Sequence, residues 1–278
     1  MNPADYFITI NPVGLTGAAA ARYTQEVREH LTWIDRTKSG RLLLTCIRRP
    51  TFPVEIRPYV ASGNALNQRC NARGGSEIRG GVLQGTVQYT PGVFARSGAC
   101  AGHPIGENRG RIADEILFHE LIHVFRAATN KWDETPPFSI GMTHYTNNEE
   151  FVAVLCTNIY VSDRTNKFKS GLRAGHAGFS AMAPDDAKRF GFYASSRAAF
   201  GLVKKFCTDH PIFTKALSDK LADVEYNPIA DYYRYPKICE MLSSVGSSKD
   251  MVKLTAAFVA AGAPPEAAAR MAAIIAFH

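Results

Sequence analysis

The chain has 278 residues, of which 46% are hydrophobic, and it carries a formal net charge of +7. This length is enough for one large domain, or for one domain with a helical extension. A membrane-spanning helix needs about 18 or more consecutive apolar residues, and the sequence contains no such stretch. The first residues also lack the basic segment and apolar core of an ordinary signal peptide. We therefore expect synthesis in the cytoplasm, no membrane insertion, and, for any export, a route that does not read such signals.

The positive charge is concentrated before residue 111, and the rest of the chain is close to neutral. A basic surface of this kind could contact nucleic acid, anionic lipid or an acidic protein. The basic residues are scattered, however, and no RNA-recognition, zinc-finger or basic-helix pattern occurs. We therefore predict no nucleic-acid partner.

The six cysteines form no Cys-x-x-Cys pair, which argues against a cysteine zinc site or a thioredoxin-like motif. Cys70 and Cys100 flank a glycine-rich segment and could pair in an oxidising compartment, but the missing signal peptide favours free thiols. Cys156 falls in an apolar helical pattern and is expected to be a core residue.

Hydrophobic periodicity and turn residues predict a mixture of elements before residue 111. The predicted strands cover residues 6–10, 42–47, 54–60 and 85–89. A helix is predicted at residues 17–37, where apolar residues recur at helical spacing. Glycine-rich stretches predict loops at residues 63–81 and 96–110.

Helical spacing dominates the rest of the chain. The predicted helices cover residues 111–129, 147–160, 185–209 (interrupted near Gly191) and 249–278 (broken at Pro264-Pro265). Residues 131–146 are predicted to be a linker, and residues 210–235 a mixture of helix and turn. We predict one domain over residues 1–240 and a helical extension over residues 241–278 that packs on it.

The predicted helix at residues 111–129 contains the sequence His119-Glu120-Leu121-Ile122-His123. Residues i and i+4 share one face of a helix, so both imidazoles can bind one metal ion. Glu120 lies beside them, within reach of a water molecule on that metal. This is the H-E-x-x-H arrangement of zinc hydrolases, with two His ligands and a Glu general base. A pair of hydrogen-bonded core histidines is the alternative interpretation.

A catalytic zinc site needs a third protein ligand. The extended motif H-E-x-x-H-x-x-G-x-x-H is excluded, because Arg126 and Thr129 occupy its last positions. The next predicted helix begins with Glu149-Glu150, which supplies two candidate carboxylates.

The positions of the two glutamates in the helix predict different roles for them. Thr146-x-x-Glu149 fits a capping box, which assigns Glu149 to the helix start. Glu150 points about 100° away and shares its face with the small residue Ala153, which allows close approach. We therefore predict Glu150 as the third ligand and keep Glu149 as the alternative. A further alternative is that both are acids that cap the helix or stabilise its dipole. The weaker candidates, in the linker, are His144 and Asp133.

Peptide hydrolysis also needs a donor for the tetrahedral oxyanion besides zinc. Tyr145 precedes the Glu-bearing helix, and Arg173 and His176 lie in a glycine-rich segment after it. We predict oxyanion stabilisation by Tyr145, His176 or Arg173, in that order. The alternative is that Tyr145 packs in the core and Arg173 is solvated.

The order of a strand, a loop and an H-E-x-x-H helix is typical of the zincin fold. In zincins an edge strand above the metal binds the substrate backbone as an added strand. We predict that Val87-Gln88-Tyr89 forms this edge, with an ordinary sheet strand as the alternative. The predicted class is α+β and zincin-like: a small mixed sheet with an edge strand above the H-E-x-x-H helix, a following Glu-bearing helix, and a mostly helical C-terminal part.

HELIH followed by the Glu-Glu helix (NNEEF) resembles gluzincin-type peptidases. Among these it most resembles bacterial effector and toxin metallopeptidases, such as NleD-like type III effectors and clostridial neurotoxin light chains. The resemblance covers roughly residues 85–160 and rests on His119, Glu120, His123 and Glu150. It implies one Zn²⁺ per chain, a protein substrate in a target cell, and secretion without a signal peptide. A secretion chaperone or a cognate immunity protein would be a further partner.

The chain departs from thermolysin-like enzymes at one position. These enzymes place an Asp one helical turn after the Glu ligand, where it orients a His. Val154 stands there in this chain, so we expect Thr157 or Asn158, a turn further on, to take that role.

The leading functional hypothesis is a zinc-dependent metalloendopeptidase, secreted as a bacterial effector or toxin that cleaves a protein of a host or rival cell. Glu120 would accept a proton from the water that attacks the scissile amide. One alternative is a zinc amidase acting on peptidoglycan. The other is a non-catalytic binding module with a structural metal or none.

Overall fold

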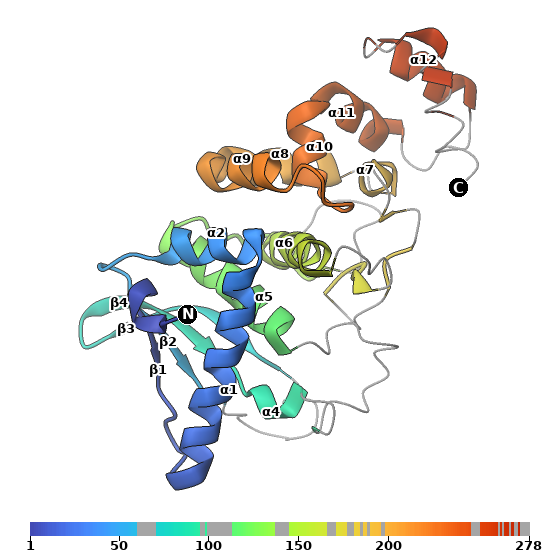
Figure 1. Ribbon diagram of the computed structural model, residues 1–278. Helices are drawn as coiled ribbons and strands as arrows, with labels where there is room; N and C mark the ends of the chain where they lie inside the picture. Colours follow the sequence, from blue (N-terminus) through green and yellow to red (C-terminus); the bar gives the residue numbers. More distant parts are fainter. Residues whose placement is uncertain are drawn as a thin grey trace.

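The computed structural model gives the arrangement of most of the chain (Figure 1). It describes residues 1–59, 71–94, 98, 113–136, 145–165, 171–176, 181–183, 186–187, 190–195, 198–245, 251–260, 262, 264–266, 268–269 and 272. Cys70, Cys100 and His144 lie outside these residues. Among the helices that the structure describes, none has the length and apolar content needed to cross a membrane.

A four-stranded mixed sheet forms the N-terminal part, as the α+β prediction requires. Its strands, in spatial order, are β1 (Ile8–Ile10), β2 (Val54–Arg57), β4 (Val82–Gln88) and β3 (Arg73–Arg79). β1, β2 and β4 are parallel, whereas β3 runs antiparallel to β4 and forms an edge. Two predictions are therefore wrong: residues 73–79 of the predicted loop form a strand, and the segment 87–89 lies in or just after an interior strand.

The two faces of the sheet differ in chemistry. Val54, Ile56 and Val87 are buried against the helices, as alternation along a strand requires. The opposite face carries ion pairs that cross the strands: Arg57 of β2 binds Glu77 of β3 at 3.0 Å, and Arg79 of β3 binds Glu55 of β2 at 2.7 Å. Among the residues that the structure describes, the helices therefore pack on the apolar face and the other face is polar.

The chain before the central helices forms α1 (Gly17–Arg36) and α2 (Lys38–Ile47), with a 3-10 turn at Pro3–Tyr6 and a short helix α4 at Pro91–Phe94. The strand predicted at residues 42–47 is wrong, because this segment belongs to α2. The hydroxyl of Thr37 caps α2 by accepting a hydrogen bond from the amide of Gly40 at 2.9 Å. A short apolar run fits a buried helix as well as a strand, and here the cap decides between them.

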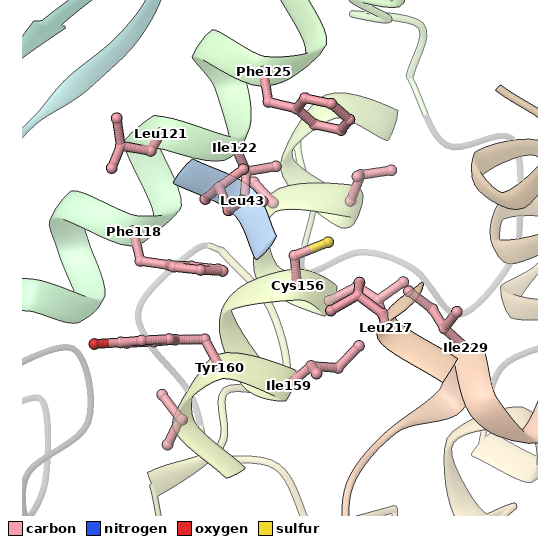
Figure 2. Packing of buried hydrophobic residues seen from close by; sticks show 14 of the residues in the cluster. Leu43, Phe118, Leu121, Ile122, Phe125, Cys156, Ile159, Tyr160, Leu217 and Ile229 are labelled. Atoms are coloured by element: carbon pink, nitrogen blue, oxygen red, sulfur yellow. The ribbon is translucent and has the colours of Figure 1, made fainter. Parts of the chain in front are cut away.

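The central pair of helices consists of α5 (Ala113–Ala128) and α6 (Asn148–Thr165), close to the predicted positions. Phe118 of α5 stacks on Tyr160 of α6, with ring centroids 4.3 Å apart. Figure 2 shows Cys156 and Ile159 of α6 among apolar side chains from the surrounding helices. Cys156 is buried, as predicted for a core residue.

A layer of helices covers α2 and α6 on the side away from the sheet (Figure 1). It contains α7 (Gly191–Ser195), α8 (Ala199–Asp209), α9 (Pro211–Lys220), α10 (Pro228–Arg234) and α11 (Pro236–Val245), with α12 (Met251–Ala260) outermost. The predicted helix at residues 185–209 is two separate helices, α7 and α8. The predicted domain boundary after residue 240 falls inside α11, and Phe258 of α12 is buried.

The edge strand β3 packs on α5 without any intervening side chain. A Cβ on Gly74 would lie 2.1 Å from the carbonyl oxygen of Glu120, a distance that no side chain can adopt. Glycine therefore permits the close approach of strand to helix at this point. The approach brings the backbone of β3 next to the H-E-x-x-H segment.

We expect Gly74→Ala to lower the free energy of unfolding by roughly 3 kcal/mol, because the added methyl must push two backbones apart. The matched control is Gly201→Ala in α8, where a Cβ meets nothing within 4 Å. That change should raise the stability by about 0.5–1 kcal/mol through helix propensity. Chemical denaturation measures both, and equal effects would contradict the close approach.

Candidate functional site

Helix α5 places His119 and His123 on one face, one turn apart. Their rings are nearly perpendicular, at 81°, and their Nε2 atoms are 3.2 Å apart. Both side chains are buried. The sequence motif therefore forms the converging pair of imidazole nitrogens that its spacing predicts.

The first turn of α6 brings Glu150 to the same point. Its Oε2 atom lies 3.2 Å from Nε2 of His119 and 3.6 Å from Nε2 of His123. Burial alone would raise the pKa of Glu150, but hydrogen bonds from both imidazoles hold this pKa well below its usual value. The Glu150 carboxylate is therefore ionised beside the two rings.

His176 completes the cluster from the segment after α6. Its Nε2 atom is 3.4 Å from Oε2 of Glu150, and its ring stacks on His119 with centroids 5.6 Å apart. Ligand atoms of His119, Glu150 and His176 all lie within 4.8 Å of one another. The sequence prediction named His176 for the oxyanion, and the structure brings it to this cluster.

The spacing of these atoms can be compared with that of a zinc site. Tetrahedral ligands at Zn–N and Zn–O distances near 2.1 Å lie about 3.4 Å from one another. The three distances among His119, His123 and Glu150 are 3.2, 3.2 and 3.6 Å. Two imidazoles and one carboxylate are also a ligand set typical of catalytic zinc. The residues present therefore fit Zn²⁺.

Glu149 binds the outer side of His123. Its carboxylate accepts hydrogen bonds from Nδ1 of His123 at 3.1 Å, from Nε of Arg126 at 2.6 Å and from the amide of Asp133 at 3.2 Å. The capping-box interpretation of Glu149 is wrong, because the carboxylate turns inward and Asn147 caps the helix by accepting from the amide of Glu150. Glu149 instead fixes the ring of His123 with Nε2 toward Glu150.

The charges around His123 decide its protonation. Burial lowers the pKa of His123, but the carboxylates of Glu149 and Glu150 outweigh this effect and raise it to about 10. Burial lowers the pKa of His119 to about 3. Without a metal, His123 is therefore the cationic imidazolium at neutral pH, with a proton on both ring nitrogens, and His119 is the neutral imidazole.

The outer side of His119 faces Thr157 and Arg173. The hydroxyl of Thr157 donates to the carbonyl of Ala153 at 2.7 Å, and its oxygen lies 3.4 Å from Nδ1 of His119. Thr157 thus stands where the sequence analysis expects an orienting residue, whereas Asn158 binds the backbone of Arg173 at 2.8 and 2.9 Å.

Arg173 is almost completely buried, with a relative exposure of 1%. Its Nη2 atom lies 3.2 Å from Nδ1 of His119, and its Nε atom lies 3.4 Å from the carboxylate of Glu115. The alternative of a solvated Arg173 is therefore wrong. Arg173 lies behind His119, on the side away from Glu150.

Glu120 lines a cleft of about 370 Å³ together with His119, His123, Glu150 and His176. Burial raises the pKa of Glu120 to about 7, although the amide of Gly74 on β3 donates a hydrogen bond that lowers it. A carboxyl group with this pKa can both accept and return a proton near neutral pH.

Two other predicted residues lie elsewhere. Tyr145 packs edge-on against Phe151, with ring centroids 5.3 Å apart, and burial raises its pKa. The carboxylate of Asp133 binds the amide of Thr135 and the side chain of Asn148, so it does not face the imidazoles.

Several residues at the site carry no sequence signal that would find them. Trp132 lies against His123, with ring centroids 5.5 Å apart, and lines the cleft. Arg126 is buried and reaches Nε2 of His210 at 3.3 Å. The only hint in the sequence is that an arginine interrupts the apolar face of the helix at position 126.

Comparisons of this chain with protein-family models, curated proteins and solved structures find no match.

The two glutamates should differ in what they stabilise. Glu149→Gln leaves the buried Arg126 without its anionic partner, so we expect the metal-free protein to lose about 3–5 kcal/mol of stability. Zinc affinity should also fall about 10–100-fold, since His123 loses its orienting partner. Glu150→Gln should weaken zinc binding more than this and lower the metal-free stability less than Glu149→Gln does, because Glu150 is partly exposed and Arg126 keeps its partner. Thermal unfolding of the metal-free variants and zinc titration measure these two effects. If Glu149 were the ligand, Glu149→Gln would weaken zinc binding more than Glu150→Gln.

Proposed function

We propose that the protein is a zinc metalloendopeptidase with a zincin-like fold of the gluzincin type. The observation that carries the proposal is the convergence of His119, His123 and Glu150, with Glu120 beside them in an open cleft. A closed structural zinc site would have four protein ligands. Here the fourth side faces the cleft, and His176, at its margin, is partly exposed.

Each residue has a chemical role in this proposal. His119, His123 and Glu150 hold Zn²⁺, which when bound acidifies a water molecule and polarises the scissile carbonyl. Glu120 takes a proton from the attacking water and returns it to the leaving amine. Glu149 accepts from Nδ1–H of His123 and so holds this imidazole in the tautomer that leaves Nε2 for the metal.

The edge strand supports the zincin-like part of the proposal. β3 is antiparallel to its neighbour, lies at the rim of the sheet and passes next to Glu120 at Gly74. An extended substrate could add to this edge and bring its backbone to the cleft. β3 takes the role that the sequence analysis gave to residues 87–89.

Among the three oxyanion candidates, the geometry favours His176. The side chain of His176 is 39% exposed, whereas that of Arg173, which also lines the cleft, is 2% exposed and lies at Nδ1 of His119. Tyr145 packs on Phe151. Burial lowers the pKa of His176, so a neutral imidazole would donate the hydrogen bond. Arg173 then acts as a positioning residue.

The resemblance of HELIH and NNEEF to effector and toxin peptidases supports a biological setting. In this setting the protein leaves a bacterium without a signal peptide and cleaves a protein of a host or rival cell. A secretion chaperone or an immunity protein would bind it before delivery.

Glu120→Gln tests the proposed chemistry. We expect proteolysis of a cell lysate to fall about 10²–10⁴-fold, because the amide cannot accept a proton. Zinc content and thermal stability should be retained. The matched control, Glu29→Gln on the exposed side of α1, should change neither. Full proteolysis by the Glu120→Gln protein would contradict the proposed general base.

Zinc binding should become stronger as the pH rises from 6 to 8. The proton on His123 must leave before zinc can bind, so the dissociation constant should fall about tenfold per pH unit. Calorimetry in buffers of different ionisation enthalpy should show about one proton released. The measurement is best made in the Glu120→Gln protein, which removes the other group that titrates near neutral pH. Binding that does not vary with pH would argue against His123 as a ligand.

A further inference from the structure

A groove follows β3 away from the candidate metal centre. It has a volume of about 600 Å³ and shares Arg73, Gly74, Trp132 and Glu134 with the cleft that contains Glu120. The two hollows are therefore continuous along the edge strand. At its far end the groove is lined by Leu83 of β4 and by Ala127 and Asn130 from the end of α5.

The hairpin between β3 and β4 ends in exposed apolar side chains. Ile78 is 76% exposed and Leu83 is 47% exposed, and the two residues are cross-strand partners on one face. This face is the one that packs on α5 nearer the site, through Gly74 and Gly85. Beyond the end of α5 the face continues into solvent, with nothing among the described residues covering these two side chains.

Leu83 lines this groove and Ile78 is its cross-strand partner, so the exposed apolar pair adjoins the groove and can contact an apolar side chain bound there. We infer that Ile78 and Leu83 form a subsite for an apolar side chain of the protein substrate. This inference rests on the proposed peptidase function and names the substrate class: an extended segment with a large aliphatic or aromatic residue upstream of the scissile bond.

The strand geometry fixes the position of that residue. A substrate that pairs antiparallel to β3 runs from the hairpin tip toward Glu120, so the residues along the groove precede the scissile bond. Gly74 and Ile78 are four residues apart in β3, about 13 Å at the rise of a strand, and share one face. The substrate residue opposite Ile78 therefore lies four or five positions before the bond.

The chain offers a matched control at the same tip. Val82 is 52% exposed, but it pairs with Arg79 and points to the opposite face of the hairpin. Val82→Ser removes a similar apolar surface without touching the subsite. Serine substitutions at such exposed positions should change stability by no more than about 0.5 kcal/mol.

Peptides from a digested cell lysate, with cleavage sites mapped by mass spectrometry, test the inference. Wild type and Val82→Ser should favour Ile, Leu, Val or Phe four or five residues before the bond. The double variant Ile78→Ser/Leu83→Ser should cleave such peptides about tenfold less efficiently and lose the preference. The best-cleaved peptide, fluorescently labelled, should also bind metal-free Glu120→Gln protein about tenfold more weakly when both serines are present.

The outcomes separate the inference from the proposed function. Three outcomes would overturn the subsite and leave the peptidase proposal standing. They are cleavage without this preference, a preference for an apolar residue after the bond, and a preference that survives in the double variant. Zinc-loaded protein that cleaves no peptide and no lysate protein would overturn the peptidase proposal and the subsite with it.

Discussion

The candidate site depends on the charged contact between α5 and α6. Burying an ionised group costs several kcal/mol unless partners surround it. Glu149 and Glu150 of α6 meet this requirement with His119, His123 and Arg126 of α5. A slide of one helix by a turn, about 5.4 Å, would separate both carboxylates from their partners. Charge therefore fixes the register of the two helices more sharply than apolar packing alone.

Arg126 extends this contact to the C-terminal helices. Its guanidinium donates to Glu149 and to the carbonyl of Lys131, and it lies 3.3 Å from Nε2 of His210, the residue between α8 and α9. Burial, followed by the positive charge of Arg126, lowers the pKa of His210 to about 3, so its ring stays neutral and can accept from the guanidinium. The helical layer after residue 198, which carries no sequence motif, thus supports the ring of His123 through two buried side chains.

Much of this arrangement could be predicted from the sequence where the pattern is local. Two features are properties of single helices, and the structure shows both of them. They are the spacing of His119 and His123 and the apolar periodicity of α5 and α6. The segment at residues 42–47 was ambiguous, because a short apolar run has no distinct period. β3 was missed because its glycines resemble a loop, although Gly74 is required by the contact with Glu120.

The roles of Glu149, Trp132 and Arg173 depend on contacts between distant segments, which one sequence does not reveal. Glu149 fits a capping box by its position, but the buried charge of Arg126 turns its carboxylate inward. Arg173 has glycines near it in the sequence, which suggest exposure, yet Glu115 and Asn158 hold it in the interior. In both cases a long-range ionic or polar contact overrides the local signal.

The neighbouring glutamates show how one helical turn can place two carboxylates in different surroundings. Adjacent residues on a helix point about 100° apart, so each carboxylate faces a different side of the imidazole pair. Glu149 is 1% exposed and satisfies the buried cation, whereas Glu150 is 19% exposed and faces the cleft. The different surroundings of the two carboxylates therefore follow from their adjacent positions on one helical turn.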